Sequence, residues 1–339
     1  MKRSLRDIQN GWTRRQFLTG LAGGGTVLLT GLGGFLWFKG HKLRTEVFIA
    51  KVPDYSGNIA GAIREGLREL GIGPDEIKGK RVLLKPNLVE THLGFAHINT
   101  NPLVIRGAIE AFRALGAAEV IVAEGPGHCR DSLLLVEESG LSEVLLEDKI
   151  HFVDLNYDDV LRVPNASRWS TLNDLIVPKT LKQVDWVVSM PKMKTHHWTG
   201  VTLSMKNMFG VMPGSYYGWP KNILHWAGIQ QSILDINTTL KPNLAIVDGI
   251  VGMEGDGPIM GNPRHVGAIV IGRNLPAVDA TCARIMCINP QKIQYLKIAD
   301  GRIGTIREAN IYQRGEKIAS VQTPFALVEK IPAHKMLRL

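Results

Sequence analysis

The 339-residue chain has little cysteine and lacks several short motifs that mark common enzyme and metal-binding classes. Its three cysteines, Cys129, Cys282 and Cys287, form no CxxC pair, so we expect neither an iron–sulfur cluster nor a structural zinc site. Cys282 and Cys287 are five residues apart on a predicted helix, a spacing that disfavours a disulfide. GxSxG, HExxH and EF-hand spacings are also absent, which excludes the hydrolases and calcium sites built on them.

Basic charge is spread unevenly along the chain. Residues 1–46 hold eight of the 40 Lys and Arg residues but only two of the 31 acidic ones, which is +6 of the net charge of +9. Residues 47–339 are therefore nearly balanced, and no basic helix with interleaved aromatic residues occurs there. We expect no nucleic-acid partner.

The N-terminal segment has the pattern of an export signal. Arg14-Arg15, a polar residue and Phe17-Leu18 match the twin-arginine pattern, and the 22 residues from Phe17 to Phe38 carry no charge but contain seven glycines. At about 1.5 Å rise per residue, a helix of this length just crosses a hydrocarbon core of roughly 30 Å. The alternative is an ordinary buried helix preceded by a chance arginine pair.

The residues at the end of this run indicate whether the segment is cleaved and where in the cell the protein is located. Trp37-Phe38-Lys39 follow it in place of a small-x-small cleavage site. Our hypothesis is therefore an uncleaved anchor, residues 1–44, in the cytoplasmic membrane. The N-terminus would be cytoplasmic and the main domain periplasmic, with the membrane and the twin-arginine translocation machinery as partners.

From residue 45 onward, strand patterns alternate with helical ones. The expected strands are 45–52, 81–86, 119–125, 174–179, 185–192, 243–249 and 265–272. The expected helices are 58–70, 101–117, 131–148, 276–287 and a long one within 221–240. Apolar strands separated by helices predict an α/β fold, a mainly parallel sheet with helices on both faces, over residues 45–300. Residues 301–339 are expected to form a small β appendage and a tail.

The ends of the predicted strands carry polar and glycine residues. Ligands of parallel α/β sheets bind beyond the carboxyl ends of the strands. This rule selects four stretches as site candidates: Lys85-Pro86-Asn87, Glu124-Gly125-Pro126-Gly127-His128, Pro191-Lys192-Met193-Lys194 and Asp248-Gly249. The second stretch could also present backbone N–H groups to an anion.

Residues 191–210 concentrate positive charge, with three lysines and two histidines. In an extended strand Lys192, Lys194 and His196 share one side, and a short helix after it carries Lys206. Neighbouring ammonium groups either spread into solvent, as in a plain surface loop, or share an anion. A desolvated lysine has a lowered pKa and can act as a base or nucleophile. His197 points the other way and is expected to be structural.

Acidic residues follow in a glycine-rich stretch, "IVDGIVGMEGDGP". Asp248 and Glu254 predict either pocket walls that neutralise the lysines or oxygen ligands for a divalent metal; a plain turn is the third interpretation. On the helix within 221–240, Trp226, Ile229, Ile233, Ile236 and Leu240 predict a core seam. His225 lies on its polar face, where a structural role is the simpler interpretation.

At "LLKPN", "PKMKTH", "SMKNMFG", "AIVDGIVGMEGDGP" and "PAVDATCARIM" the chain resembles the domain of unknown function 362 family, over roughly residues 45–300. The resemblance implies an α/β protein, in a family where twin-arginine leaders are common and some members carry ferredoxin-like segments. This chain has no such cysteine segment. The family's recurrent polar positions correspond in this chain to Lys85, Asn87, Lys192, Lys194, His196, Lys206, Asn207, Asp248, Glu254 and Asp279.

A fainter similarity is to the nickel-pincer lactate racemase family at "MKNMFGVMPG". It implies attachment of a nucleotide cofactor at Lys206 and proton transfer by histidines such as His196. The chain departs from that family at Ser204-Met205, where the family has a glycine pair.

The residues and the resemblance together predict an enzyme that acts on a small anionic substrate. Lys192, Lys194, His196 and Lys206 are the expected catalytic residues; Lys85, Asn87 and Asn207 are expected to bind substrate; Asp248 and Glu254 are expected to bind any divalent metal. The alternatives are a non-catalytic binding or assembly subunit of a membrane redox complex, and a nickel-pincer racemase-like enzyme.

Overall fold

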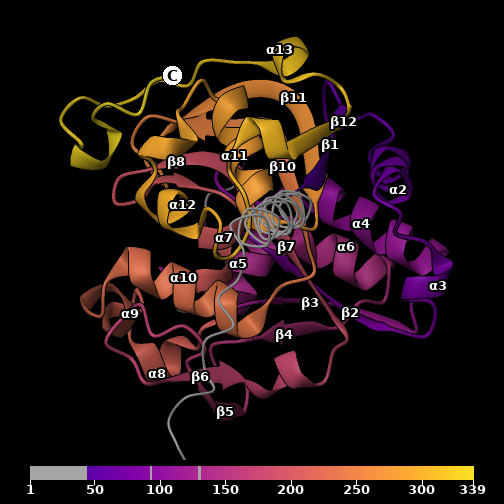
Figure 1. Cartoon of the computed structure of the whole chain (residues 1–339). Coiled ribbons are helices and arrows are strands. Elements are labelled where there is room, and N and C mark those ends of the chain that lie inside the picture. Colours follow the sequence, from indigo (N-terminus) through magenta and orange to yellow (C-terminus); the bar gives the residue numbers. More distant parts are fainter. Residues whose placement is uncertain (1–43, 92–93, 129–130) are drawn as a thin grey trace, which may run out of the picture. The chain divides into compact units, whose positions relative to one another are not determined.

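A ten-stranded sheet organises the described chain, in the order β12-β1-β11-β10-β7-β2-β3-β4, with β8 paired to β10 and β9 paired to β8 (Figure 1). Its strands are β1 (Thr45–Lys51), β2 (Arg81–Pro86), β3 (Glu119–Glu124), β4 (Phe152–Asp154), β7 (Trp186–Met190), β8 (Lys192–His196), β9 (Gly200–Thr202), β10 (Leu244–Glu254), β11 (Asn262–Gly272) and β12 (Ile311–Gly315). A separate antiparallel hairpin joins β5 (Val160–Pro164) and β6 (Asp174–Pro178).

The sheet is mostly parallel, as the sequence predicts. β10, β7, β2, β3 and β4 pair side by side in parallel, and β8 runs parallel to β10. β11 is antiparallel to both β1 and β10, and β9 is antiparallel to β8. The carboxyl ends of β2, β3, β7 and β10 therefore share one edge of the sheet.

Helices cover both faces of the sheet in Figure 1. One face packs on α2 (Ile59–Glu69), α4 (Pro102–Ala114), α5 (Ser132–Glu138) and α6 (Leu141–Glu147). The other packs on α7 (Ser204–Asn207), α10 (Ile229–Leu240), α11 (Leu275–Ile285) and α12 (Gln294–Ala299). The shorter helices are α3 (Pro74–Ile77), α8 (Gly214–Tyr217), α9 (Asn222–Trp226) and α13 (Ile318–Val321). Two apolar cores result, one on each side of the sheet.

Asparagine caps explain where the long helices begin. Asn58, Asn101 and Asn274 accept a backbone N–H from the first turn of α2, α4 and α11. Proline follows within the first two positions of α4 and α11, where its missing N–H costs no helical hydrogen bond.

Two of the predicted helices are broken at glycine. The helix expected over 131–148 divides into α5 and α6 at Gly140 (φ +74°), and the one within 221–240 divides into α9 and α10 at Gly228 (φ +102°). Glycine adopts these positive φ values without steric strain. The predicted core seam is therefore wrong at Trp226, which is 81% exposed, while Ile233 and Ile236 are fully buried.

Residues 301–339 do not form the appendage that the sequence predicts. Their single strand, β12, adds in parallel to the edge of the main sheet through β1, and residues 45–339 form one compact unit.

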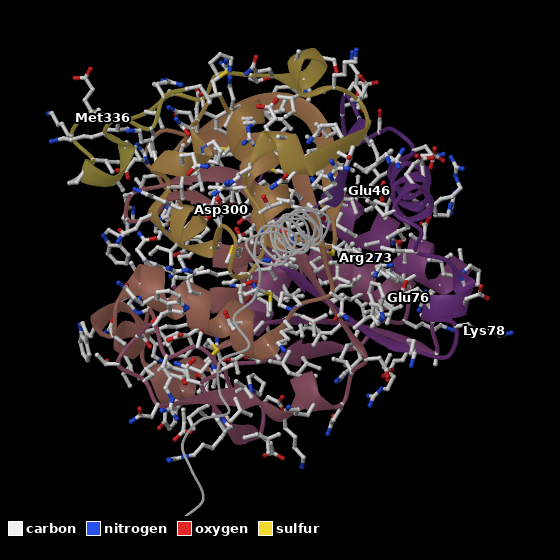
Figure 2. All side chains as sticks on the ribbon, viewed as in Figure 1. Glu46, Glu76, Lys78, Arg273, Asp300 and Met336 are labelled. Atoms are coloured by element: carbon white, nitrogen blue, oxygen red, sulfur yellow. The ribbon has the colours of Figure 1, made fainter. Side chains whose placement is uncertain are left out.

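Exposed ion pairs join distant segments of this unit. Arg314 binds Glu46 across the β1–β12 edge. Arg273 Nη1 binds Glu76 Oε1 at 2.9 Å, and Figure 2 labels both of these residues.

The structure is a computed structural model that describes residues 44–91, 94–128 and 131–339. The twin-arginine pattern, the uncharged run of residues 17–38 and Cys129 lie outside these ranges. Within them, no helix combines the length and the apolar character that crossing a membrane requires.

Candidate functional site

A cavity of about 710 Å³ opens at the shared carboxyl edge of the sheet. Residues from the ends of β2 and β3, from β8 and β9, from α7 and α9, and from the loop after β10 line it. Its ionisable lining residues are Lys85, Lys194, Lys206, Lys221, His128, His196, His197, His225, Glu90, Glu124 and Asp256. The polar ends of separate strands therefore meet around one space.

Lys85 and Glu124 form a buried ion pair in the cavity wall. Lys85 Nζ donates to Glu124 Oε2 at 2.7 Å, to the Pro86 carbonyl at 2.8 Å and to Asn207 Oδ1 at 2.9 Å. The Asn207 amide nitrogen in turn donates to the Lys85 carbonyl and to Ser189 Oγ. All three ammonium protons of Lys85 are thus used within the protein. Lys85 and Asn207, which were predicted to bind substrate, line the cavity, but their side chains are hydrogen-bonded to each other.

Gly210 makes room for this pair. A Cβ atom at Gly210 would collide with both Glu124 Oε1 and Lys85 Nζ. Glu124 Oε1 also accepts the Gly125 backbone N–H at 2.9 Å, and Oε2 accepts that of Leu88 at 3.0 Å. Neighbouring loops therefore fix the carboxylate as well as the ammonium group.

Lys221 is a buried lysine that the sequence did not single out. Its ammonium group donates to three carbonyls, those of Gly125, Gly210 and Met212. Burial lowers its pKa to about 7 against the opposing attraction of Glu124. Lys221 therefore ties the loop after β3 to the segment after α7. It lies in a stretch rich in Gly, Pro and aromatic residues, which carries no periodic signal.

Lys194 and Lys206 keep donors for a ligand. Lys194 Nζ is buried and donates to the carbonyls of Ile98 (2.9 Å) and Pro258 (3.2 Å), which leaves one N–H. Lys206 Nζ lies 4.2 Å from the centre of the Phe209 ring and has no hydrogen-bond partner among the described residues. Burial, with the nearby charge of Lys85, lowers the pKa of Lys206 to about 7. Burial, with Lys192 and Lys206, also lowers the pKa of Lys194.

Two imidazoles in the cavity are held in opposite tautomers. His196 Nδ1 accepts the Trp198 backbone N–H at 3.0 Å, so its neutral ring carries the proton on Nε2. His225 Nδ1 lies 3.0 Å from the Lys221 carbonyl, to which it must donate, so its Nε2 is a bare acceptor. Burial and the charge of Lys206 lower both pKa values, that of His225 to about 4. Both rings are neutral at neutral pH.

Two further polar atoms in the lining have no partner. Asn87 Oδ1 and Thr202 Oγ1 are buried and make no hydrogen bond within the described residues, and their side chains are 8% and 4% exposed. Both residues line the cavity. Buried polar atoms are normally paired, so these two are ready to bind a ligand. Asn87 was predicted to bind substrate, whereas Thr202 was missed.

Lys192, predicted to share a side with Lys194 and His196, lies outside the cavity that those two residues line. Its Nζ donates to Asp248 Oδ2 at 2.6 Å and to the Tyr55 hydroxyl at 3.0 Å, and it does not line the cavity. Lys192 pairs with Asp248 on β10, while Lys194 pairs with Met253. Two positions on β8 thus span five on β10, so the pairing of the two strands is irregular between these points.

The predicted metal pair is separated. Asp248 is fully buried, and besides Lys192 and Tyr55 it accepts the Asn101 backbone N–H at 2.9 Å. Glu254 accepts the Ala326 N–H at 2.8 Å and lies 3.6 Å from Arg264. Neither lines the cavity, and among the described residues no group of three or more His, Cys, Asp or Glu side chains is placed to hold a metal ion. Asp248 and Glu254 therefore serve as separate structural ties.

Asp279 positions the short helix α7. Its carboxylate accepts the backbone N–H groups of Ser204 (2.7 Å) and Met205 (3.1 Å), together with the Ser204 hydroxyl. These bonds occupy donors at the start of the helix that carries Lys206 and Asn207. Burial raises the pKa of Asp279 to about 7. The carboxylate does not line the cavity but positions Lys206 and Asn207 by fixing the start of α7.

Comparison with known proteins identifies the family. The family described as a domain of unknown function (DUF362) matches residues 82–284, more than half of the chain. The chain belongs to this family. The matched range holds every residue that lines the cavity, among them Lys85, Lys194, His196, Lys206 and His225.

Similar proteins are known among curated sequences and solved structures. The thylakoid-associated protein sll1697 of Synechocystis sp. is 27% identical over 264 residues, which cover 74% of this chain and 76% of that protein. A protein of Thermotoga maritima aligns with a TM-score of 0.37 and 15% identity, over 66% of this chain and 58% of that one. The lactate racemase apoprotein of Thermoanaerobacterium thermosaccharolyticum aligns with a TM-score of 0.45 and 11% identity, over 72% and 57%. The chain thus spans little more than half of either solved structure, and neither likeness assigns an activity to it.

Proposed function

We propose that this DUF362 protein is an enzyme that binds an anionic substrate at Lys194 and Lys206 and moves a proton with His196 and His225. The observation that carries the proposal is the pair of neutral imidazoles of opposite tautomer in one cavity. One presents an N–H, the other a lone pair, which are the needs of a general acid and a general base.

The lysines supply the attraction for the anion. Lys85 and Lys221 use their ammonium protons within the protein, whereas Lys194 and Lys206 keep donors. A charge-assisted hydrogen bond to a carboxylate is stronger than one between neutral groups. Asn87 Oδ1 and Thr202 Oγ1 would take the substrate's remaining polar groups. Lys192, expected at first to be catalytic, has no part in this arrangement.

Anion binding is expected to depend on pH through Lys206. Its pKa of about 7 means that the ammonium form, which attracts an anion, prevails below pH 7 and is lost above it. Butyrate stays ionised over this range, so its affinity should be greatest near pH 6. Above pH 7 it should fall, by up to about tenfold per pH unit if one proton is linked to binding. Calorimetric titration at pH 6, 7, 8 and 9 measures this.

The matched variants for this titration are Lys206→Met and Lys292→Met. Lys206→Met should bind butyrate weakly, with little change from pH 6 to 9. Lys292 is exposed and does not line the cavity, so Lys292→Met should bind butyrate with the affinity and pH dependence of the wild type. An affinity that is the same at pH 6 and pH 9 in the wild type would exclude Lys206 as the anion's partner.

We further propose that the chain acts on the outer face of the cytoplasmic membrane. The twin-arginine pattern and the uncharged run that follows it support this placement, as does the thylakoid association of a relative at 27% identity. The full chain should sediment with membranes, and protease added outside spheroplasts should digest it. Arg14→Lys with Arg15→Lys should leave it protected inside. A mature N-terminus near residue 40 in the mass spectrum would overturn the anchor.

The non-catalytic alternative differs in one observable. A binding or assembly subunit would take up an anion without exchanging its protons with water. The nickel-pincer alternative stays a prediction; a covalent nucleotide adduct at Lys206 in the protein purified from its native host would support it.

A further inference from the structure

The cavity is much larger than its cationic part. Pockets of about 300–1,000 Å³ hold drug-sized molecules, and this one measures about 710 Å³. A carboxylate that reaches Lys194 and Lys206 fills a small share of that space. The rest of the volume has room for a larger molecule, and its lining indicates which chemistry would fit.

Apolar side chains line the rest of the cavity. They come from three separate segments, namely the loop after β2, the residues around β8 and α7, and the loop between β10 and β11: Leu88, Trp198, Phe209, Pro258, Ile259 and Met260. Leu88 and Phe209 are buried, but Trp198 is 52% exposed and Met260 is 77% exposed. A ligand that covers large apolar side chains beside a cavity removes them from water, and this lowers the free energy of the complex.

A series of rings connects this apolar part with the cationic one. The ring centres of Trp198 and His225 lie 4.9 Å apart, and those of His225 and Phe209 lie 5.3 Å apart, both edge to face. Lys206 Nζ lies over the other end of the series, 4.2 Å from the Phe209 centre. A molecule whose anionic end is at Lys206 therefore has its body directed along Phe209 and His225 toward Trp198.

We propose that the substrate is an amphiphilic anion, whose charged end binds Lys194 and Lys206 and whose apolar body covers Trp198, Phe209 and Met260. The inference rests on the proposed function for the charged end and adds the chemical class of the remainder. The body is an acyl chain or an aromatic group of medium length. Acids of two or three carbons would leave the Trp198 end of the cavity in water.

The test is a homologous series of straight-chain carboxylates, from acetate through butyrate and hexanoate to octanoate, titrated into the full chain at pH 6. Each methylene that becomes buried is worth roughly 0.8 kcal/mol, which is about three- to fourfold in affinity. Octanoate should therefore bind about a hundredfold tighter than acetate if about four of its methylenes become buried. Octanamide, which has the same chain without the charge, should bind much more weakly than octanoate.

Two tryptophans form a matched pair of variants. Trp198→Ala should weaken octanoate by about tenfold, the effect of exposing about two methylenes, and should leave acetate within about twofold. Trp226→Ala removes another exposed tryptophan, on α9, which does not line the cavity, and should change neither affinity. A loss of fold in Trp198→Ala would also weaken acetate, so the ratio of the two affinities reports the apolar contact itself.

The outcomes separate this inference from the proposed function. Equal affinities for acetate and octanoate, both abolished in Lys206→Met, would overturn the apolar subsite and leave the anion site intact. A tight octanoate complex that is insensitive to Trp198→Ala would likewise overturn the inference. No binding of any carboxylate at millimolar concentration would contradict the proposed function.

Discussion

The Lys192→Met variant is expected to be about 3–5 kcal/mol less stable than the wild type in urea unfolding, and to bind anions normally. Lys192 and Asp248 have fully buried side chains in a 2.6 Å ion pair. Removal of one partner leaves the other charge uncompensated in a low-dielectric environment, and losses of about this size follow. The cavity should be unaffected because Lys192 does not line it.

A double variant distinguishes the ion pair from other causes. Lys192→Met with Asp248→Asn removes both charges, so it should recover part of the stability that the single variant loses. If Lys192→Met instead kept its stability and lost butyrate binding, Lys192 would be a residue of the site, as the sequence predicts, and its structural role in the ion pair would be wrong.

The second large effect is expected at His225. Its Nε2 is the bare acceptor in the cavity, so His225→Phe should remove the general base and slow proton transfer by about 10²–10⁴-fold. His196→Phe should remove the N–H donor with a loss of similar size. Transfer is measured by NMR as the entry of deuterium from D₂O into carbon-bound positions of carboxylates that bind the wild type. His151→Phe, an exposed position outside the cavity, is the control.

The pH profile of this exchange follows from the same groups. The pKa of His225 is lowered to about 4, so its base form is lost only when the pH falls through about 4. The ammonium form of Lys206 is lost as the pH rises through about 7. Exchange should therefore be greatest between these values and fall on both sides. Wild-type binding without exchange in any tested carboxylate would favour the non-catalytic alternative.

Much of the site follows from local sequence patterns. Alternation of strands and helices predicts the mostly parallel sheet, and the rule that ligands bind at the carboxyl ends selects Lys85, Lys194 and Glu124. The structure places all three around one cavity, with His196 and Lys206. Each of these residues directly follows, or belongs to, an element whose pattern is clear in the sequence.

The parts that the sequence does not predict depend on contacts between distant segments. Lys221 donates to the carbonyl of Gly125, 96 positions away, and no local pattern encodes such a bond. Lys192 lies outside the cavity because its ammonium group binds Asp248, 56 positions away, and no local pattern encodes that ion pair. Trp226 was assigned to the core because the helical period was continued through Gly228. In the structure Gly228, with φ of +102°, ends that period before α10 begins.

The most direct test of the central claim is the ¹⁵N spectrum of the histidine side chains in the full chain at pH 7. We predict a neutral His196 ring with its proton on Nε2 and a neutral His225 ring with its proton on Nδ1, assigned through the His196→Phe and His225→Phe spectra. Two charged rings, or two rings with the proton on the same nitrogen, would contradict the acid–base pair on which the proposed function depends.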